Sequence, residues 1–428
     1  MIKSLTKNDF VKQVMLLVSG ATIGQAISFF ASLATSRLFS PEDFGILGFY
    51  LSAVGISSVF ANGKYDLGIV ILKDNGVVRS LVRLCLVLLF FFCILLTLLG
   101  ILAFMFSDGL GISQEKIQWL PFLGLGVFLS GYANVMYMFF TRLKWFGVLS
   151  LSRILESIGL NGLAIVFWFV GSSGLLIGFL ASQVLSIVYY EYRIRKLSKD
   201  TECSEKSSVG LGDLIQLAKE LINYPKYNIF LSFMDMLQTQ VFFLLGSIWF
   251  QTAVLGWYSF SMRILQVPLY LIVKPLSNVF LAKAADHFKN QQTLLPLVRK
   301  TIFSTFLLAL PLFLILFFLG PLLFAFLFGE AWEPAGIICS ILSFWMIIDL
   351  VRVPISQIPV ILGRQKEMVG WTTLGTLITI LSIAYAGLYH PKDIYMAFSI
   401  ITLGQSCFAL MIIFVTYKQA ITHDRNIA

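Results

Sequence analysis

The chain has 428 residues, of which 58% are hydrophobic and only 12% are charged, and its formal net charge is +9. Soluble domains are about 45–50% apolar and about 25% charged, so this composition excludes an ordinary soluble protein. The positive charge does not point to a nucleic-acid partner, because lysine and arginine collect in the cytoplasmic loops of membrane proteins.

Apolar segments long enough to cross a bilayer recur along the whole chain. A bilayer core about 30 Å thick needs roughly 20 apolar residues per helix, and residues 84–106 and 302–328 meet that need without a single charge. The pattern predicts an all-α, polytopic membrane protein with about twelve transmembrane helices. We place these helices near residues 13–36, 43–63, 82–106, 119–140, 147–170, 173–192, 221–248, 254–280, 302–327, 334–361, 368–388 and 393–417.

Basic residues occupy every second loop of this arrangement, whereas the intervening loops carry mostly acids. The basic loops are residues 1–12, 64–83, 142–144, 193–219, 283–300, 364–366 and 418–425. Because lysine and arginine favour the cytoplasmic side of a membrane, we expect both termini in the cytoplasm.

A long polar linker divides the predicted spans into two equal sets. Residues 194–218 form this cytoplasmic linker between an N-terminal six-helix lobe, residues 1–193, and a C-terminal six-helix lobe, residues 219–428. The sequence LGFY opens the second span at residues 47–50, and LGWY opens the eighth at residues 255–258. This predicts a parallel repeat, and transporters built from repeats place substrate at the repeat interface near mid-membrane.

The eighth predicted span carries the strongest polar stripe. Its members recur at helical spacing on one face: Ser259, Arg263, Gln266, Tyr270 and Lys274. A charge at mid-depth, as predicted for Arg263, costs about 2.5–3.5 kcal/mol and therefore usually faces water or a partner. Shorter stripes occur in the seventh span (Asn228, Ser232, Asp235, Thr239) and the first (Gln25, Ser28, Ser32, Thr35). We expect the three faces to line one aqueous cavity between the lobes, although serine and threonine stripes also serve helix packing.

Other charges in or near the spans have two interpretations. Arg153 with Glu156 and Asp349 with Arg352 are i,i+3 pairs that either neutralise one another or serve the substrate. The cytoplasmic-rim residues are Lys64, Asp66 and Arg153, and Lys274 also lies near that rim. Snorkelling of long side chains explains rim charges equally well.

The sequence shows no sign of an enzyme. It has no Gly-rich phosphate loop, no HExxH motif and no long extramembrane domain, and its three histidines are scattered at His287, His390 and His423. We therefore expect no enzymatic activity, no cofactor and no metal site.

Several short motifs, in order along nearly the whole chain, carry a family resemblance. They are SRLFSPEDFG (36–45), KYDLGIV (64–70) with KD (73–74), YPKY (224–227), RILQVP (263–268), FGEAW (328–332) with AG (335–336), and LGR (362–364). Together they resemble the polysaccharide-transporter branch of the multidrug/oligosaccharidyl-lipid/polysaccharide (MOP) exporter superfamily, of the O-antigen flippase type. Two residues depart from the family pattern, Tyr224 where phenylalanine is usual and Lys274 where an uncharged residue is common.

The resemblance implies a two-lobed helical bundle in the bacterial inner membrane. It implies alternating-access flipping of an undecaprenyl-diphosphate-linked oligosaccharide from the cytoplasmic to the periplasmic leaflet, for O-antigen and lipopolysaccharide biosynthesis. Membrane lipid, a coupled proton or sodium ion, a polysaccharide polymerase and a chain-length regulator are the implied partners. Because arginine binds phosphate oxygens through a planar fork, we predict that the diphosphate is held by Arg263, Arg37, Lys274, Arg352 and Gln266. Asp235 and Asp349 are the predicted ion-coupling residues.

Three alternatives stay open. A drug exporter of the same superfamily would favour buried acids over a basic cavity. A peptidoglycan-precursor flippase usually has fourteen spans. A membrane-embedded polysaccharide polymerase or acyltransferase would need a catalytic pair and usually a long periplasmic loop.

Overall fold

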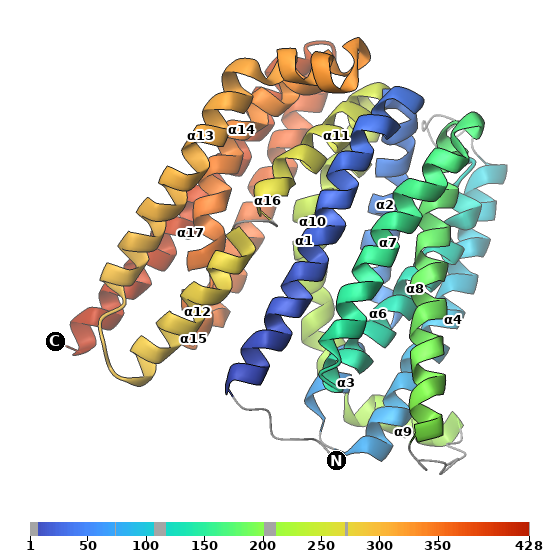
Figure 1. Ribbon diagram of the computed structural model, residues 1–428, viewed down its shortest axis with the longest axis vertical. Coiled ribbons are helices and arrows are strands. Elements are labelled where there is room, and N and C mark those ends of the chain that lie inside the picture. The colour runs from blue at the N-terminus through green and yellow to red at the C-terminus, as the bar shows by residue number, and fades with distance from the viewer. Residues whose placement is uncertain (1–6, 73, 107–116, 201–210, 270–272, 428) are drawn as a thin grey trace. The chain divides into compact units, whose positions relative to one another are not determined.

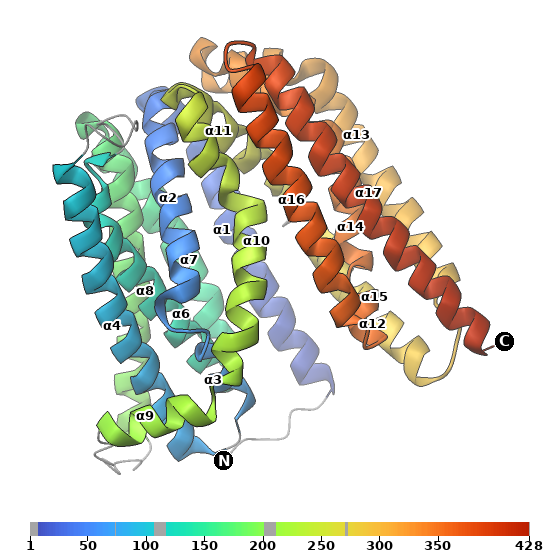
Figure 2. The same ribbon diagram turned by 180° about the vertical axis from the view of Figure 1, so that it is seen from behind.

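The computed structural model describes residues 7–72, 74–106, 117–200, 211–269 and 273–427 (Figures 1 and 2). Within these ranges the chain is helical and contains no strand, which confirms the predicted all-α class. Ten helices of the described residues are long and apolar enough to cross a membrane. The protein is therefore a multi-pass membrane protein.

The helices follow the predicted spans closely, with three short additions near helix ends. Their bounds are α1 (Lys7–Leu38), α2 (Pro41–Ala61), α3 (Asp66–Ile71), α4 (Asn75–Met105), α6 (Leu123–Arg142), α7 (Phe146–Val166), α8 (Ser172–Asp200), α9 (Leu211–Glu220), α10 (Asn223–Trp249), α11 (Thr252–Pro268), α12 (Lys274–Lys289), α13 (Leu295–Phe328), α14 (Glu333–Ile355), α15 (Ile358–Ile361), α16 (Gln365–Tyr389) and α17 (Ile394–Ile427). Three 3-10 turns, η2 (Leu120–Phe122), η3 (Trp168–Val170) and η5 (Glu330–Trp332), join them.

The eighth predicted span, 254–280, is covered by two helices, and Leu269 and Val273, the described residues between them, are π-helical. α11 ends at Pro268 and α12 begins at Lys274. Proline lacks a backbone N–H and clashes with the preceding turn, and Pro275 follows at the start of α12. The continuation of the stripe beyond Gln266 stays a prediction, because Tyr270 and the side chain of Lys274 lie outside the described residues.

The chain forms two compact units. Unit 1 comprises residues 1–38 and 46–236, and unit 2 comprises residues 39–45 and 237–428. In unit 1, α7 lies between α1 and α8, and α6 packs on α4 and α8 (Figure 1). In unit 2, α14 packs on α13 and α17, and α16 lies along α17 (Figure 2).

Within the predicted linker, residues 194–200 form the end of α8 and residues 211–218 belong to α9. Helix α9 packs on α4. The predicted lobes, residues 1–193 and 219–428, and their linker stay a prediction about topology.

The polar stripe of α1 is used in packing against α7. Ser28 Oγ lies 2.8 Å from Ser157 Oγ and accepts a hydrogen bond of 3.2 Å from Asn161. Gly20 and Gly24 bring the two backbones together, since a Cβ on Gly20 would lie 2.1 Å from Ser150 Oγ. Small and hydroxyl residues commonly join membrane helices in this way. The packing interpretation therefore accounts for Ser28.

One end of unit 1 is closed by a buried cluster beneath α9. Tyr65, Ile69, Cys85 and Phe140 belong to this cluster, as does Leu214 of α9. The Tyr65 hydroxyl donates a 2.9 Å hydrogen bond to the carbonyl of Ala218. Burial raises the pKa of the Tyr65 phenol, which keeps this donor protonated. The segment before α3 is thereby tied to the short amphipathic helix α9.

Two of the family motifs, SRLFSPEDFG and FGEAW, meet inside unit 2. Phe44 lies edge-on to Phe260 and Trp332, with ring centroids 5.4 and 5.3 Å apart, and Phe260 lies 4.2 Å from Trp332. Gly256 faces the carbonyl of Pro41 so closely that a Cβ there would lie only 1.7 Å from it. These residues therefore hold the start of α2 against α11 and η5, which is a structural role.

Candidate functional site

Unit 1 contains a polar cavity of about 300 Å³ between four helices. Each helix contributes residues at helical spacing, and the lining is Leu51, Val54, Gly55 and Ser58 of α2, Ser130, Ala133, Asn134 and Tyr137 of α6, Arg153 and Glu156 of α7, and Phe179, Gln183, Ser186 and Tyr190 of α8. Cavities of this size and mixed lining are typical of small-molecule sites.

An ion pair on α7 forms one wall of the cavity. Arg153 Nη1 donates to Glu156 Oε2 at 3.1 Å, and Glu156 Oε1 accepts a 2.8 Å bond from Gln183. The Arg153 guanidinium also lies over the Tyr137 ring, 5.0 Å from its centroid. Arginine has five N–H donors, and the Arg153 side chain is 47% exposed. It can therefore bind a ligand hydroxyl or anion while keeping Glu156.

Tyr190 is held rigidly at another wall. Its hydroxyl lies 2.7 Å from Ser152 Oγ, and its ring stacks on Phe140 with centroids 5.3 Å apart. A fixed aromatic face beside amide and guanidinium groups suits a ligand that has both hydroxyls and apolar ring faces.

Asp66 is a buried carboxylate directly behind the cavity wall. Its side chain is 2% exposed, and Oδ2 accepts a 2.8 Å bond from Asn134, which lines the cavity. In the described part of the chain Asp66 Oδ1 has no hydrogen-bond partner. A buried carboxylate oxygen without a donor is costly, so Asp66 is a candidate ion-coupling residue.

Arg142 fixes the short helix that carries Asp66. Its Nη1 donates to the carbonyl of Ile69 at 3.1 Å and to the carbonyl of Leu72, at the carboxyl end of α3. Arginine at a helix C-terminus satisfies carbonyls that have no partner within the helix. Lys64, just before α3, has a left-handed backbone with φ of 57°. The KYDLGIV motif thus has a fixed backbone conformation that positions Asp66.

The structure separates the predicted site residues into several places. Arg153 lines the cavity and Asp66 lies behind it, whereas Arg37 is exposed in the last turn of α1 and Asp235 is exposed on α10. Arg263 and Gln266 are half-buried on one face of α11, opposite buried Ile264 and Leu265. The side chain of Lys274 lies outside the described residues.

Asp349 and Arg352 form an ion pair within α14. Arg352 Nε donates to Asp349 Oδ1 at 2.7 Å, and the guanidinium lies 5.6 Å from the centroid of the Phe408 ring. A direct ion pair one helical turn apart is what the interpretation of mutual neutralisation predicts for Asp349 and Arg352.

Sequence reasoning missed most of the cavity lining. Asn134, Tyr137, Gln183 and Tyr190 lie outside the polar stripes predicted in the first, seventh and eighth spans. A signal was present, because Phe179, Gln183, Ser186 and Tyr190 recur at the spacing of one helix face.

The sequence pattern of a family described as "Polysaccharide biosynthesis protein" matches residues 34–337, which include every residue of the cavity lining. The chain belongs to this family. No curated protein matches the sequence. The resemblance to the polysaccharide-transporter branch is thereby confirmed.

Solved structures confirm the MOP exporter fold of this family member. The lipid II flippase MurJ, in an inward closed conformation, is similar with a TM-score of 0.71 and 16% identity over 96% of this chain and 90% of that chain. An inward-facing multidrug-resistance MATE transporter of the MOP superfamily has a TM-score of 0.65 and 11% identity over 97% and 99% of the two chains. A MOP superfamily transporter from Pyrococcus furiosus has a TM-score of 0.56 and 14% identity over 96% of each chain.

Proposed function

We propose that the protein is a flippase rather than an enzyme, and that it moves an undecaprenyl-diphosphate-linked oligosaccharide across the bacterial inner membrane. Transport runs by alternating access from the cytoplasmic to the periplasmic leaflet, with both termini in the cytoplasm, and supplies O-antigen or a related polysaccharide. Membership of a polysaccharide biosynthesis family supports the substrate class. The neighbouring folds of a lipid II flippase and of exporters support the activity.

The polar cavity of unit 1 is the observation that carries this proposal. Sugars present hydroxyls to amides, carboxylates and guanidinium groups, and they present their C–H faces to aromatic rings. Gln183, Asn134 and the Arg153–Glu156 pair supply the first kind of contact, and Tyr137 and Tyr190 supply the second. We infer that this cavity receives the sugar part of the substrate.

The diphosphate and the coupling ion belong to the same proposal. Arg263 and Gln266, on the half-buried face of α11, are proposed to bind the diphosphate, with Arg37, Lys274 and Arg352 as further basic candidates. Proton or sodium coupling is proposed through Asp235 or Asp349, and the structure adds Asp66 on account of its burial. A polysaccharide polymerase and a chain-length regulator are the proposed partners.

A drug exporter is the second candidate function. The similarity to MATE transporters, together with the buried Asp66 and the cavity acid Glu156, favours it, because buried carboxylates bind cationic drugs. The two candidates differ in the charge of the transported molecule.

Reconstituted transport distinguishes the candidates. Purified protein in liposomes should move a fluorescent lipid-linked oligosaccharide between leaflets and should not concentrate a cationic dye. Gln183→Ala removes one hydrogen bond to the sugar and one to Glu156, so we expect about tenfold slower flipping.

The matched control is Gln292→Ala, which changes an exposed loop glutamine and should keep the wild-type rate. Dye export without lipid flipping would reject the flippase. Normal flipping in Gln183→Ala would move the sugar site out of this cavity.

A further inference from the structure

A second cavity, of about 360 Å³ and mostly apolar, lies between α16 and α17 in unit 2. Its α16 wall carries Arg364, Glu367 and Trp371, at a spacing of three to four residues, and its α17 wall runs from Met411 to Thr422. At 1.5 Å per helical residue this wall is about 16 Å long. The cavity shares no residue with the cavity of unit 1.

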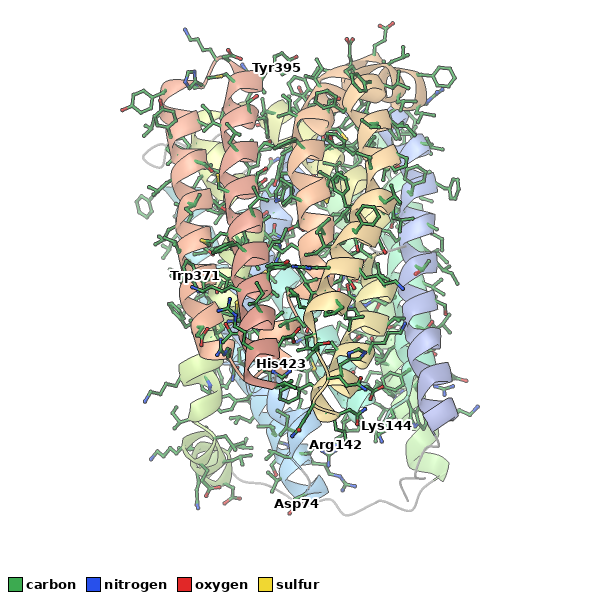
Figure 3. The ribbon with its side chains drawn as sticks, turned by 90° about the vertical axis from the view of Figure 1, so that its left-hand side faces the viewer. Asp74, Arg142, Lys144, Trp371, Tyr395 and His423 are labelled. Atoms are coloured by element: carbon green, nitrogen blue, oxygen red, sulfur yellow. The ribbon has the colours of Figure 1, made fainter. Side chains whose placement is uncertain are left out.

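The polarity of this groove changes along its length, and it does so in the same direction on both helices. Arg364, Glu367, Lys418 and Gln419 surround the end near the start of α16 and the close of α17. Further along, both walls are apolar, with Trp371 on one side and Met411, Phe414 and Val415 on the other. Figure 3 shows Trp371 nearer to the His423 end of the helix pair than to the Tyr395 end.

The charged end has its own hydrogen-bond network. Glu367 Oε2 accepts a 3.0 Å bond from Gln419 Nε2, and Glu367 Oε1 lies 3.8 Å from Arg364 Nε. Gln419 is only 3% exposed, yet within the described chain its Oε1 has no hydrogen-bond partner. A buried amide oxygen without a donor is costly, and a ligand hydroxyl would satisfy it.

The charges at this end favour a single negative charge. Among the described lining residues, two cations, Arg364 and Lys418, accompany one acid, Glu367, which is a net charge of +1. Arg364 also occupies the N-cap position of α16, where the helix dipole is positive. A phosphodiester carries one negative charge, whereas a polyprenyl diphosphate carries more and would be repelled by Glu367.

We propose that this groove binds an anionic phospholipid of the phosphatidylglycerol type. The phosphate lies between Arg364 and Lys418, a headgroup hydroxyl donates to Gln419 Oε1, and one acyl chain lies along Trp371, Met411 and Phe414. Basic pockets between membrane helices commonly hold such headgroups, and tryptophan is enriched at the membrane interface. The exposed ring of Phe414, 66% accessible, opens the groove toward the bilayer. The proposal is independent of the flippase function.

Trp371 provides a direct probe of occupancy. The full-length protein is reconstituted in phosphatidylcholine vesicles with increasing fractions of phosphatidylglycerol brominated on its acyl chains. Quenching that is present in wild type and absent in Trp371→Phe reports lipid at this groove. We expect half-maximal quenching at a lower mole fraction of brominated phosphatidylglycerol than of brominated phosphatidylcholine.

Charge variants test which residues bind the headgroup. Each basic residue near a membrane surface strengthens anionic lipid binding about fivefold, so Arg364→Gln and Lys418→Gln should each raise the half-maximal fraction about fivefold. Glu367→Gln removes the repelling charge and should lower that fraction about fivefold. Lys300→Gln, an exposed lysine at the start of α13 outside the groove, is the matched control and should cause no shift.

Three results would overturn the proposal. The first is equal quenching by the two brominated lipids, which would mean unselective contact with the bilayer. The second is tighter binding of brominated phosphatidylethanolamine that Glu367→Gln weakens, which would mean a zwitterionic occupant. The third is displacement of brominated phosphatidylglycerol by an equimolar polyprenyl diphosphate, which would assign the groove to the transported lipid.

Discussion

At the scale of single residues, the charges within the predicted spans have partners close at hand. Arg153 bonds Glu156 and Arg352 bonds Asp349, in each case one turn away on the same helix. Neutralisation and function are compatible for the first pair, because Arg153 faces a cavity and retains unused donors. A bonded neighbour therefore does not remove an intramembrane charge from the list of functional residues.

Asp66 tests whether a buried carboxylate takes part in transport. Asp66→Asn keeps an acceptor for Asn134 but can no longer change its charge. We expect flipping to fall at least tenfold while membrane abundance stays normal, because asparagine can no longer exchange a coupling ion beside the cavity. Flipping rates under imposed proton and sodium gradients check this, and Asp66→Glu should restore part of the rate. Wild-type rates in Asp66→Asn under both gradients would exclude coupling through this residue.

Arg263 tests the proposed diphosphate contact. Arginine cannot be deprotonated in proteins, so on the half-buried face of α11 it needs water, a carboxylate or a bound anion. Arg263→Ala should abolish export while the protein still inserts, and Arg263→Lys should retain only part, because lysine lacks the planar fork. Export is normalised to protein in the membrane, with Arg425→Ala in the exposed end of α17 as the control. Near-normal export in Arg263→Ala would move the diphosphate site away from α11.

At the scale of elements, the family motifs serve to hold helices and loops together. The SRLFSPEDFG segment contributes Phe44 to the aromatic cluster of unit 2, and the FGEAW segment contributes Phe328 and Trp332. Gly256 of the LGWY sequence lets the first turn of α2 approach α11. Tight packing in a protein interior leaves no room for an added methyl group at such a contact. The motif therefore identifies the fold more directly than the substrate.

Gly256→Ala should destabilise unit 2 by about 1–3 kcal/mol, because the added Cβ would overlap the carbonyl of Pro41. Gly162→Ala is the matched control, since no atom of the described residues outside the local helix lies within 4 Å of its Cβ position. Alanine is the better helix former, so this control should be neutral or stabilising by about 0.5–1 kcal/mol. Thermal unfolding of both variants in detergent is the measurement. Equal unfolding temperatures for the two variants would show that the start of α2 does not pack on α11 as described.

At the scale of the whole molecule, the alternation of basic and acidic loops predicts which ends of the helices face the cytoplasm. Ten helices of the described residues have the length and composition to cross a membrane. The remaining two predicted spans are α1 and the α11–α12 pair, in which the two helices have 17 and 16 residues. An odd number of crossings would place the termini on opposite sides.

Cysteine labelling tests this topology. On a cysteine-free background, cysteines introduced at Ser207 and at exposed Ala331 should react with an impermeant maleimide from opposite sides of the membrane. The positive-inside rule places Ser207 in the cytoplasm and Ala331 in the periplasm. Labelling of both positions from outside whole cells would contradict the twelve-span arrangement.

Sequence reasoning recovered the class of the protein, most helix positions and the family. A backbone that crosses the lipid has no water to bond, so its N–H and C=O groups must bond one another. A long apolar segment of the sequence therefore predicts a helix. The π-helical residues between α11 and α12 were less accessible, because prolines also lie inside an uninterrupted helix, as Pro311 and Pro321 do in α13. Local composition does not say which proline changes the helix type.

The cavity of unit 1 depended on packing between residues far apart in the chain. Gln183 meets Glu156 from 27 positions away, and Asn134 meets Asp66 from 68 positions away. Each of these side chains alone is an ordinary polar residue on a membrane helix, and nothing in its local pattern names its partner. Helix formation is a local balance that composition reveals, whereas a site between helices exists only once their faces and rotations have been chosen by tertiary packing.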